Sequence, residues 1–321
     1  MNPYLRLILS SIAALIALAA VWAVGLHALL WFVLIGGAAA SWLWVPWRGL
    51  FIMGLYMLRA RDIGAERFGR LTESWPALKY FAEARPPRTP PKHIPSKALK
   101  LVTLNAFHPS TDLAPKADFC AAQNADVISI VEARPEWQQL AAQKLYNRYP
   151  FQQLTRVASN YGHYYMLLLS KHPFVRTHIA DEGRIVHYQV HAPQGTFHLV
   201  QVHPFSPFTP DRLMARNRAI RTIASLKTAL PVVIMGDFNN VPWHSAVKYV
   251  TDTMNLHVAG LPEPTFPAAH IVPGGLTART LPVVPFDFIL VPHGAKVLYA
   301  ATHRVAGTDH LAIASIVELP H

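Results

Sequence analysis

The residues of this sequence with the clearest chemical potential are polar side chains at the ends of apolar segments. They are Asn105, Glu132, His203, Asp237, Asn239, Asp287, Asp309 and His310. A carboxylate beside an apolar strand is costly to remove from water unless it is paired, hydrogen-bonded or bound to a metal. Carboxylate and amide oxygens suit hard cations such as Mg²⁺ and Mn²⁺, and histidines exchange protons near neutral pH. The set therefore indicates metal-assisted acid–base chemistry.

Taken singly, most of these residues also have an ordinary structural explanation. The segment GDFNN (236–240) could be a turn, because Gly, Asp and Asn all favour turn geometry. Asp309-His310 could be a surface turn, and Glu132 could pair with a nearby arginine or lysine. Asp287 resists this explanation, since its neighbours in the sequence are strongly apolar. The ordered set is more specific than any of its members.

The elements that must position these residues are short apolar segments that alternate with helical patterns. The segments with strand composition are 100–107, 126–132, 164–170, 196–203, 230–237, 285–292 and 311–317. Helical patterns cover 111–123, 135–146 and 211–229. This alternation predicts an α/β domain whose sheet is largely covered by helices. Polar residues at such strand ends are expected to face one crevice.

The first 58 residues are predicted to form a membrane anchor. Apolar runs at 7–24 and 28–47 each have about the length a helix needs to cross a core of ~30 Å. A cleaved signal peptide is the alternative, but it would not be followed at once by a second apolar run. Basic residues flank the pair of runs and are absent from the connection, so both ends are expected to face the cytoplasm. A third crossing that included residues 49–58 would move the rest of the chain to the other side.

Residues 59–98 are predicted to be a basic juxtamembrane segment followed by a stiff, proline-rich linker. The whole chain has a formal charge of +11. Up to residue 98 there are 11 Lys and Arg against 4 Asp and Glu, and beyond it 18 against 14. Most of the basic excess therefore belongs to the membrane-proximal part, where it fits anionic headgroups. It is weak evidence for a nucleic-acid partner.

Composition excludes two classes of protein. The chain has 321 residues, of which 52% are hydrophobic, and disordered chains are poor in such residues. The single cysteine, Cys120, excludes a disulfide scaffold and offers no thiolate cluster for zinc. Cys120 falls in a helical pattern and is expected to be a small buried apolar residue.

From about Leu99 to the C-terminus, the ordered motifs resemble those of the endonuclease/exonuclease/phosphatase superfamily. The motifs that carry the resemblance are VTLNAF, VISIVEA, LLLSKHPF, VHPFSP, MGDFNNVPW, FDFILV and TDHLAI. The resemblance implies a four-layer α/β/β/α sandwich of two packed mixed sheets. It also implies that residues 99–321 form a catalytic domain, preceded here by the transmembrane helices.

The resemblance further implies a set of metal ligands. Glu132 would be the principal ligand of Mg²⁺ or Mn²⁺, with Asn105 and Asp309 in support. Whether one metal or two is bound stays open.

Roles in catalysis are implied in the same way. Asp237 and Asn239 would orient water and the phosphoryl group. Asp287 would hold His310 in the correct tautomer, and His310 and His203 would serve acid–base roles. Which histidine is the general acid stays open.

Weaker candidates lie nearby. Tyr161, His163 and Tyr164 are near a position where relatives contact phosphate, although ordinary strand residues are favoured. Arg184 resembles another such position, with a solvated strand arginine as an equal alternative. The arginines on the predicted helix 211–229 are interpreted as a solvated face. They are Arg212, Arg216, Arg218 and Arg221.

The function predicted from the sequence is a membrane-anchored, metal-dependent phosphodiesterase, of nuclease type as first choice. The segment HPFSP (203–207) carries a histidine where apurinic endonucleases have a Tyr-x-Pro-Asn pattern. The alternative is a lipid or inositol phosphate hydrolase, resembling sphingomyelinases or phosphoinositide phosphatases. A catalytically silent binding module is a lesser alternative. The predicted partners are the lipid bilayer and a phosphodiester substrate, and no protein partner is inferred.

Overall fold

The computed structural model describes residues 87, 89–158, 163–272, 275–279, 282 and 284–320. The predicted membrane anchor (1–58), most of the predicted linker (59–98) and Tyr161 lie outside these residues. Among the described residues, none of the helices is long and apolar enough to span a bilayer.

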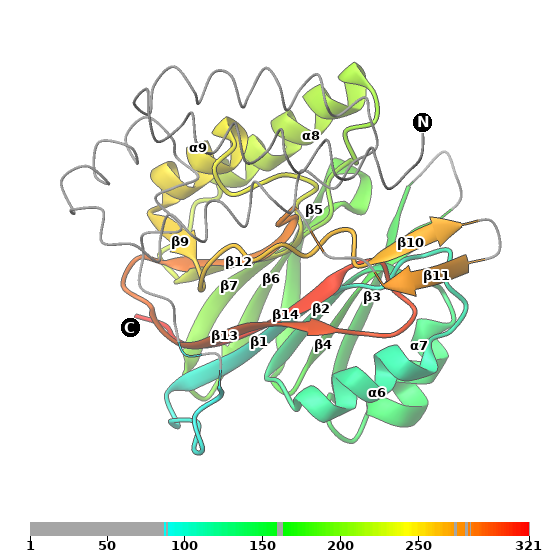
Figure 1. Cartoon of the computed structure of the whole chain (residues 1–321). Helices are drawn as coiled ribbons and strands as arrows, with labels where there is room; N and C mark the ends of the chain where they lie inside the picture. Colours follow the sequence, from blue (N-terminus) through cyan, green and yellow to red (C-terminus); the bar gives the residue numbers. More distant parts are fainter. Residues whose placement is uncertain are drawn as a thin grey trace, which may run out of the picture. The chain divides into compact units, whose positions relative to one another are not determined.

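Two six-stranded mixed sheets form the centre of the described structure (Figure 1). The first sheet has the order β13-β14-β1-β2-β4-β3. Its strands are β1 (Ala98–Asn105), β2 (Val127–Ala133), β3 (Phe151–Val157), β4 (Tyr164–Ser170), β13 (Lys296–Arg304) and β14 (Leu311–Glu318). Strands β1 and β2 are parallel, and the other neighbours are antiparallel.

The second sheet repeats this arrangement in the order β9-β12-β8-β7-β6-β5. Its strands are β5 (Phe174–Ala180), β6 (Ile185–Ala192), β7 (Gly195–Val202), β8 (Val232–Asp237), β9 (Leu256–Val258) and β12 (Asp287–Pro292). Strands β7 and β8 are the parallel pair. A separate hairpin consists of β10 (Ala269–Val272) and β11 (Gly275–Arg279).

The alternation of side chains along each strand divides the apolar residues between two cores. In β1, Leu99 and Leu101 belong to the core between the sheets, and Val102 and Leu104 belong to the core under the first pair of helices. Those helices are α6 (Ala114–Gln123) and α7 (Trp137–Leu140), which continues as a π-helical turn, η2 (Ala141–Leu145). Helices α8 (Pro210–Thr222) and α9 (Ser245–Met254) cover the second sheet. The layers of the described structure therefore follow the order helix, sheet, sheet, helix.

This architecture confirms the predicted fold of two packed mixed sheets with helices. All seven predicted strands and the three predicted helices are present. Short 3₁₀ segments follow β5 and α8, at Asp181–Gly183 and Ile223–Ser225. Strands β3, β5, β6, β9, β10, β11 and β13 and helix α9 were not predicted from the sequence. Cys120 is buried and free, as expected.

Gly236 allows the parallel strands β7 and β8 to approach each other just before Asp237. Its φ is +152°, and a Cβ at this position would lie 2.0 Å from the carbonyl oxygen of Val202, its partner in the ladder. Gly195 also has a positive φ, +129°, but a Cβ there would meet nothing within 4 Å. An alanine at Gly195 would therefore introduce backbone strain alone, whereas an alanine at Gly236 would introduce both strain and steric overlap.

We expect Gly236→Ala to lower the free energy of unfolding by about 3 kcal/mol or more, because strain and overpacking add. Gly195→Ala carries only the strain and is expected to cost about 1–2 kcal/mol. Urea unfolding of the two variants measures the difference. Equal losses would contradict the close approach of β7 and β8.

Candidate active site

The predicted site residues lie together at one end of the two sheets. Asn105 and Asp237 close β1 and β8, and Asp287 begins β12. The others follow β7 (His203) and β8 (Asn239), lie in β2 (Glu132) or come just before β14 (Asp309 and His310). The Asn105 side-chain nitrogen links the two sheets, since it donates to Glu132 Oε1 at 3.2 Å and to Asp237 Oδ2 at 3.0 Å. The structure therefore brings residues from six separate strand ends into one cluster.

Glu132 sits where strand β2 is irregular. Its φ is +55°, and the pairing of β2 with β4 shifts register between Ile130 and Ala133. A non-glycine residue in this conformation is uncommon and is often found at functional sites. Burial alone raises the pKa of Glu132, but the hydrogen bond and charge of His203 outweigh it and lower this pKa to about 2. Glu132 is therefore an anion, and its side chain remains partly exposed.

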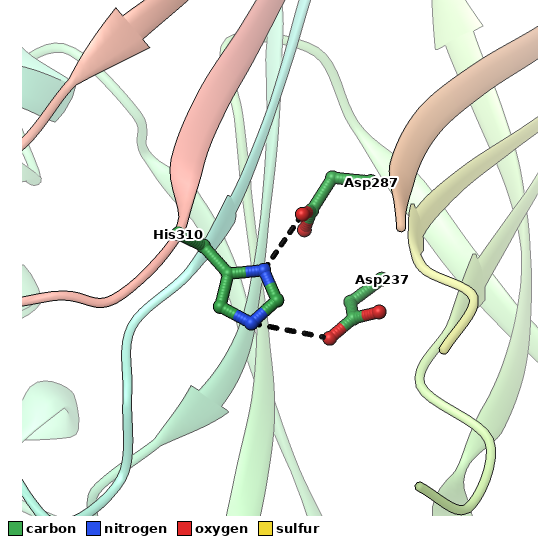
Figure 2. Close-up of side chains that lie close together, drawn as sticks. All are labelled: Asp237, Asp287 and His310. Atoms are coloured by element: carbon green, nitrogen blue, oxygen red, sulfur yellow. Dashed lines mark hydrogen bonds and ion pairs between the residues drawn. The ribbon is translucent and has the colours of Figure 1, made fainter. Parts of the chain in front are cut away.

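His310 lies between two buried aspartates (Figure 2). Its Nδ1 donates to Asp287 Oδ2 at 2.7 Å, and its Nε2 lies 3.8 Å from Asp237 Oδ2. Burial alone lowers the pKa of His310, but the charges of Asp287 and Asp237 raise it to about 10. Burial and the charge of Asp287 raise the pKa of Asp237 to about 6. The two aspartates thus favour the imidazolium form of His310 at neutral pH, and Asp287 holds its Nδ1.

His203 is held in a different way. Its Nδ1 lies 3.0 Å from the hydroxyl of Tyr164, and its Nε2 lies 3.3 Å from Glu132 Oε1 and 3.7 Å from Asp237 Oδ2. Burial raises the pKa of Tyr164 above its ordinary value, so this partner is a neutral phenol. The two histidines therefore both turn Nε2 toward the carboxylates, but the partner on Nδ1 is a carboxyl group for His310 and a hydroxyl for His203.

Asn239 joins the cluster through its backbone and its side chain. Its φ is +48°, its backbone N–H donates to Asp237 Oδ1 at 2.7 Å, and its side-chain nitrogen donates to the carbonyl of Pro204. Arg216 donates to the backbone carbonyl of Asn239 at 2.5 Å. Arg216 is only 5% exposed, so its predicted place on a solvated face is wrong. It supports the loop after β8 instead.

Asp309 supplies an oxygen suited to a cation. Its Oδ1 is buried and has no hydrogen-bond partner among the described residues. Burial raises the pKa of Asp309 to about 6, although the nearby charge of His310 acts to lower it. A cation near Glu132 and Asp309 would satisfy this oxygen and favour its ionised form. The carboxylate oxygens present therefore fit the predicted Mg²⁺ or Mn²⁺.

Asn105 fits that metal set less directly. Its Oδ1 accepts from the backbone N–H of Phe107 at 2.9 Å, so its nitrogen rather than its oxygen faces Glu132 and Asp237. Its amide would have to turn over to serve as an oxygen ligand.

A second group of potential ligands overlaps the cluster. Ligand atoms of Asp237, Asp287 and His310 all lie within 4.8 Å of one another. However, His310 Nδ1 and Asp287 Oδ2 already share a short hydrogen bond. We therefore interpret these three residues as a proton-handling group, and Glu132 with Asp309 as the better cation ligands.

Two threonines that the sequence reasoning missed support the cluster. Thr308 donates to the carbonyl of Asn105 at 2.7 Å and accepts from the backbone N–H of His310. Thr265 accepts from the backbone N–H of Asp287 at 3.2 Å. Thr308 precedes the Asp-His motif directly, which is a signal that could have been used. Thr265 has no such signal, because it lies far from any motif in the sequence.

The weaker candidates from the sequence differ in whether they lie in the site. Tyr164 is in the site, as the partner of His203. His163 is exposed and contacts Arg156, so it lies outside the cluster. Arg184 is only 2% exposed, and its guanidinium lies 3.7 Å from the centre of the Phe205 ring, so it is not a solvated arginine. It packs against the loop that follows His203.

Comparison with known proteins identifies the class to which this fold and site belong. The model of the endonuclease/exonuclease/phosphatase family matches residues 102–310, so the chain belongs to this family. Members of the family hydrolyse phosphate esters. None of the curated proteins that were compared matches the chain.

Two solved structures illustrate the similarity in fold. An endonuclease/exonuclease/phosphatase from Beutenbergia cavernae DSM 12333 is 18% identical, with a TM-score of 0.53, over 69% of this chain and 72% of that chain. TDP2 from D. rerio, solved with a single-strand DNA product, is 16% identical with a TM-score of 0.53, over 68% of this chain and 98% of that chain. At this level of identity the similarity shows the fold alone.

The His310–Asp287 pair should make stability depend on pH. A histidine whose folded-state pKa is raised from about 6.5 to about 10 stabilises the fold fully below about pH 6.5. This contribution is lost as the pH rises through about 10. We therefore expect Asp287→Asn to cost about 3–5 kcal/mol at low pH and progressively less toward pH ~10.

Urea unfolding of the parent chain and the variant across this pH range measures the effect. Asp252→Asn, an exposed acid paired with Lys248 on α9, is the matched control and should cost little at any pH. A loss in Asp287→Asn that did not change with pH would show that His310 is not held as a cation.

Proposed function

We propose that this chain is a membrane-anchored, metal-dependent phosphodiesterase. The observation that carries the proposal is the convergence of four carboxylates and two histidines from five strand ends, with both Nε2 atoms turned toward Asp237. The substrate would lie against this cluster at the shared end of the sheets. Membership of a family of phosphate ester hydrolases supports the reaction class.

Glu132 and Asp309 would hold the cation, with Asn105 in support. When bound, the cation would neutralise charge on the phosphate oxygens and lower the pKa of bound water. Mg²⁺ or Mn²⁺ suits these oxygen ligands.

The chain's own residues would handle the water and the proton. Asp237 has a pKa near 6 and lies within 4 Å of both Nε2 atoms, so it is suited to orienting the attacking water, together with Asn239. His310 is positively charged at neutral pH and can offset the charge that develops on phosphate or protonate the leaving oxygen. His203, with a neutral partner on Nδ1, is suited to hydrogen-bonding a phosphoryl oxygen.

Nucleic acid is our first choice of substrate. TDP2, whose fold is similar, was solved with a single-strand DNA product, which supports this choice. A lipid or inositol phosphate is the alternative, because an N-terminal anchor would hold the site beside such a substrate. The lesser alternative, a silent binding module, would lack activity on every substrate.

The full chain, purified in detergent, is tested with Mg²⁺ and with EDTA on plasmid DNA, RNA, sphingomyelin and phosphoinositides. We expect Mg²⁺-dependent cleavage of nucleic acid. Cleavage of lipid alone would replace the first choice by the alternative. Cleavage of none would favour the binding module.

Variants assign the activity to the site. Asp237→Asn and His310→Ala are each expected to lower kcat by on the order of 10²–10⁴-fold while the protein stays folded, as shown by circular dichroism. Asp252→Asn and His191→Ala, at exposed positions outside the cluster, are matched controls that should keep full activity. Near-normal turnover in Asp237→Asn or His310→Ala would refute the mechanism.

We further propose that residues 1–58 anchor the chain in the membrane with two crossings and that the catalytic domain faces the cytoplasm. This proposal rests on the apolar runs and flanking basic residues of the sequence. Fused after Leu58, a reporter that works only in the cytoplasm should be active, and a reporter that works only outside the cytoplasm should be inactive. Activity only outside the cytoplasm would refute the hairpin topology.

A further inference from the structure

Three histidines form a row across neighbouring strands of the second sheet, away from the candidate active site. His178 of β5 is the ladder partner of His187 of β6, and His187 is a diagonal neighbour of His198 of β7. The ring centroids are 5.4 Å apart for His178 and His187 and 5.5 Å apart for His187 and His198. We call these three residues the histidine row. Since His198 precedes His203 by five positions along β7, the row lies about 17 Å from the active-site end of that strand at ~3.4 Å per residue.

The inner two rings are at the spacing that a shared metal ion requires. His198 Nε2 lies 3.4 Å from His187 Nδ1. Two imidazole nitrogens that bind one ion at about 2.0–2.1 Å, with a tetrahedral angle, are about 3.4 Å apart. The pair could therefore accept an ion between its nitrogens with little movement of either ring.

The electrostatic surroundings also suit a metal ligand. His187 and His198 are only 6% and 7% exposed. Burial, and then the neighbouring rings of His198 and His178, lower the pKa of His187 to about 4, and burial lowers that of His198 as well. Imidazole binds metals in its neutral form, which both rings adopt at neutral pH. The two facing nitrogens share one proton in a hydrogen bond, and this proton would move to the other nitrogen of its own ring when an ion binds between them.

His178 is the exposed member of the row. Its nitrogens lie too far from those of His187 and His198 to form a three-ligand group in the present rotamer. Among the described residues, the one set whose ligand atoms all lie within 4.8 Å of one another is Asp237, Asp287 and His310. As an exposed side chain, however, it can change rotamer at small cost and bring a third nitrogen to the pair. Water would complete four-coordination, as in other three-histidine sites.

We propose that the histidine row is a second metal site, specific for a borderline transition ion such as Zn²⁺ or Co²⁺. All the ligands that the protein supplies are nitrogens, which Mg²⁺ disfavours, so the site would differ in ion type from the oxygen-rich cluster at the active site. The proposal is independent of the proposed hydrolase function, because no residue is shared between the two sites.

The test is a Co²⁺ titration of the full chain in detergent, in excess Mg²⁺ to occupy the oxygen-rich site. Tetrahedral Co²⁺ absorbs strongly in the visible range, and we expect one equivalent of this signal, displaced by Zn²⁺. Loss of a residue that only hydrogen-bonds to a metal ligand typically weakens metal binding by ~10–100-fold. Because His187→Gln and His198→Gln each remove a ligand itself, they should weaken Co²⁺ binding at least as much. The signal should persist in Asp237→Asn, which places it outside the candidate active site.

His191→Gln is the matched control, since His191 lies on the same strand as His187 but contacts Thr196 instead of the row. It should bind Co²⁺ like the parent chain. Where a buried variant fails to fold, His178→Gln gives the same test at an exposed position and should weaken binding and alter the spectrum. Absence of the tetrahedral signal in the parent chain, or equal affinity in parent, His187→Gln, His198→Gln and His178→Gln, would overturn the proposal.

Discussion

The gathering of four carboxylates, three of them buried, at one end of two apolar sheets is the constraint on which the rest of this structure depends. Asp237, Asp287 and Asp309 are almost completely buried, and Glu132 lies beside them. Charges in such surroundings are stable only when they are paired, hydrogen-bonded or bound to a cation. His310 and His203 supply part of this compensation, and backbone N–H groups supply more. The unpaired oxygens of Asp309 and Asp287, one on each side chain, mark where it is incomplete among the described residues.

The two sheets meet this constraint in parallel ways. Each contributes a polar side chain at the end of an inner parallel strand, Asn105 from β1 and Asp237 from β8, and these two are hydrogen-bonded across the interface. The next strand of each sheet contributes Glu132 and His203, which also contact each other. The site therefore depends on both sheets packing correctly, which explains why its residues are spread over more than 200 positions of the chain.

Much of this arrangement could be predicted from the sequence. The strands that carry the site are short, continuous apolar runs because they are buried on both faces, and such runs are easily identified. Strand β5 was missed because it lies at a sheet edge and is mostly exposed, so its composition is mixed. The eight site residues were predicted because their order matched a known set of motifs, and the structure brings all of them together.

What the sequence could not supply is the contacts between distant residues. Tyr164 and His203 are 39 positions apart, and Thr308 and Asn105 are 203 apart, so neither hydrogen bond has a local signature. Arg216 resembles its exposed neighbours Arg218 and Arg221 on α8, and only the packing of the helix shows that it is buried. Burial of a charged residue depends on which face of a helix meets the sheet, and that face is set by the whole fold.

The measurement that most directly tests the central claim is Mn²⁺ binding to the full chain, followed by electron paramagnetic resonance. We propose that the cation is bound by Glu132 and Asp309, and that the His310–Asp287 pair handles protons. Glu132→Gln should then weaken Mn²⁺ binding by at least about tenfold, whereas Asp287→Asn should leave a clear Mn²⁺ site. Unchanged affinity in Glu132→Gln, with loss in Asp287→Asn, would contradict this account and place the metal between Asp237, Asp287 and His310.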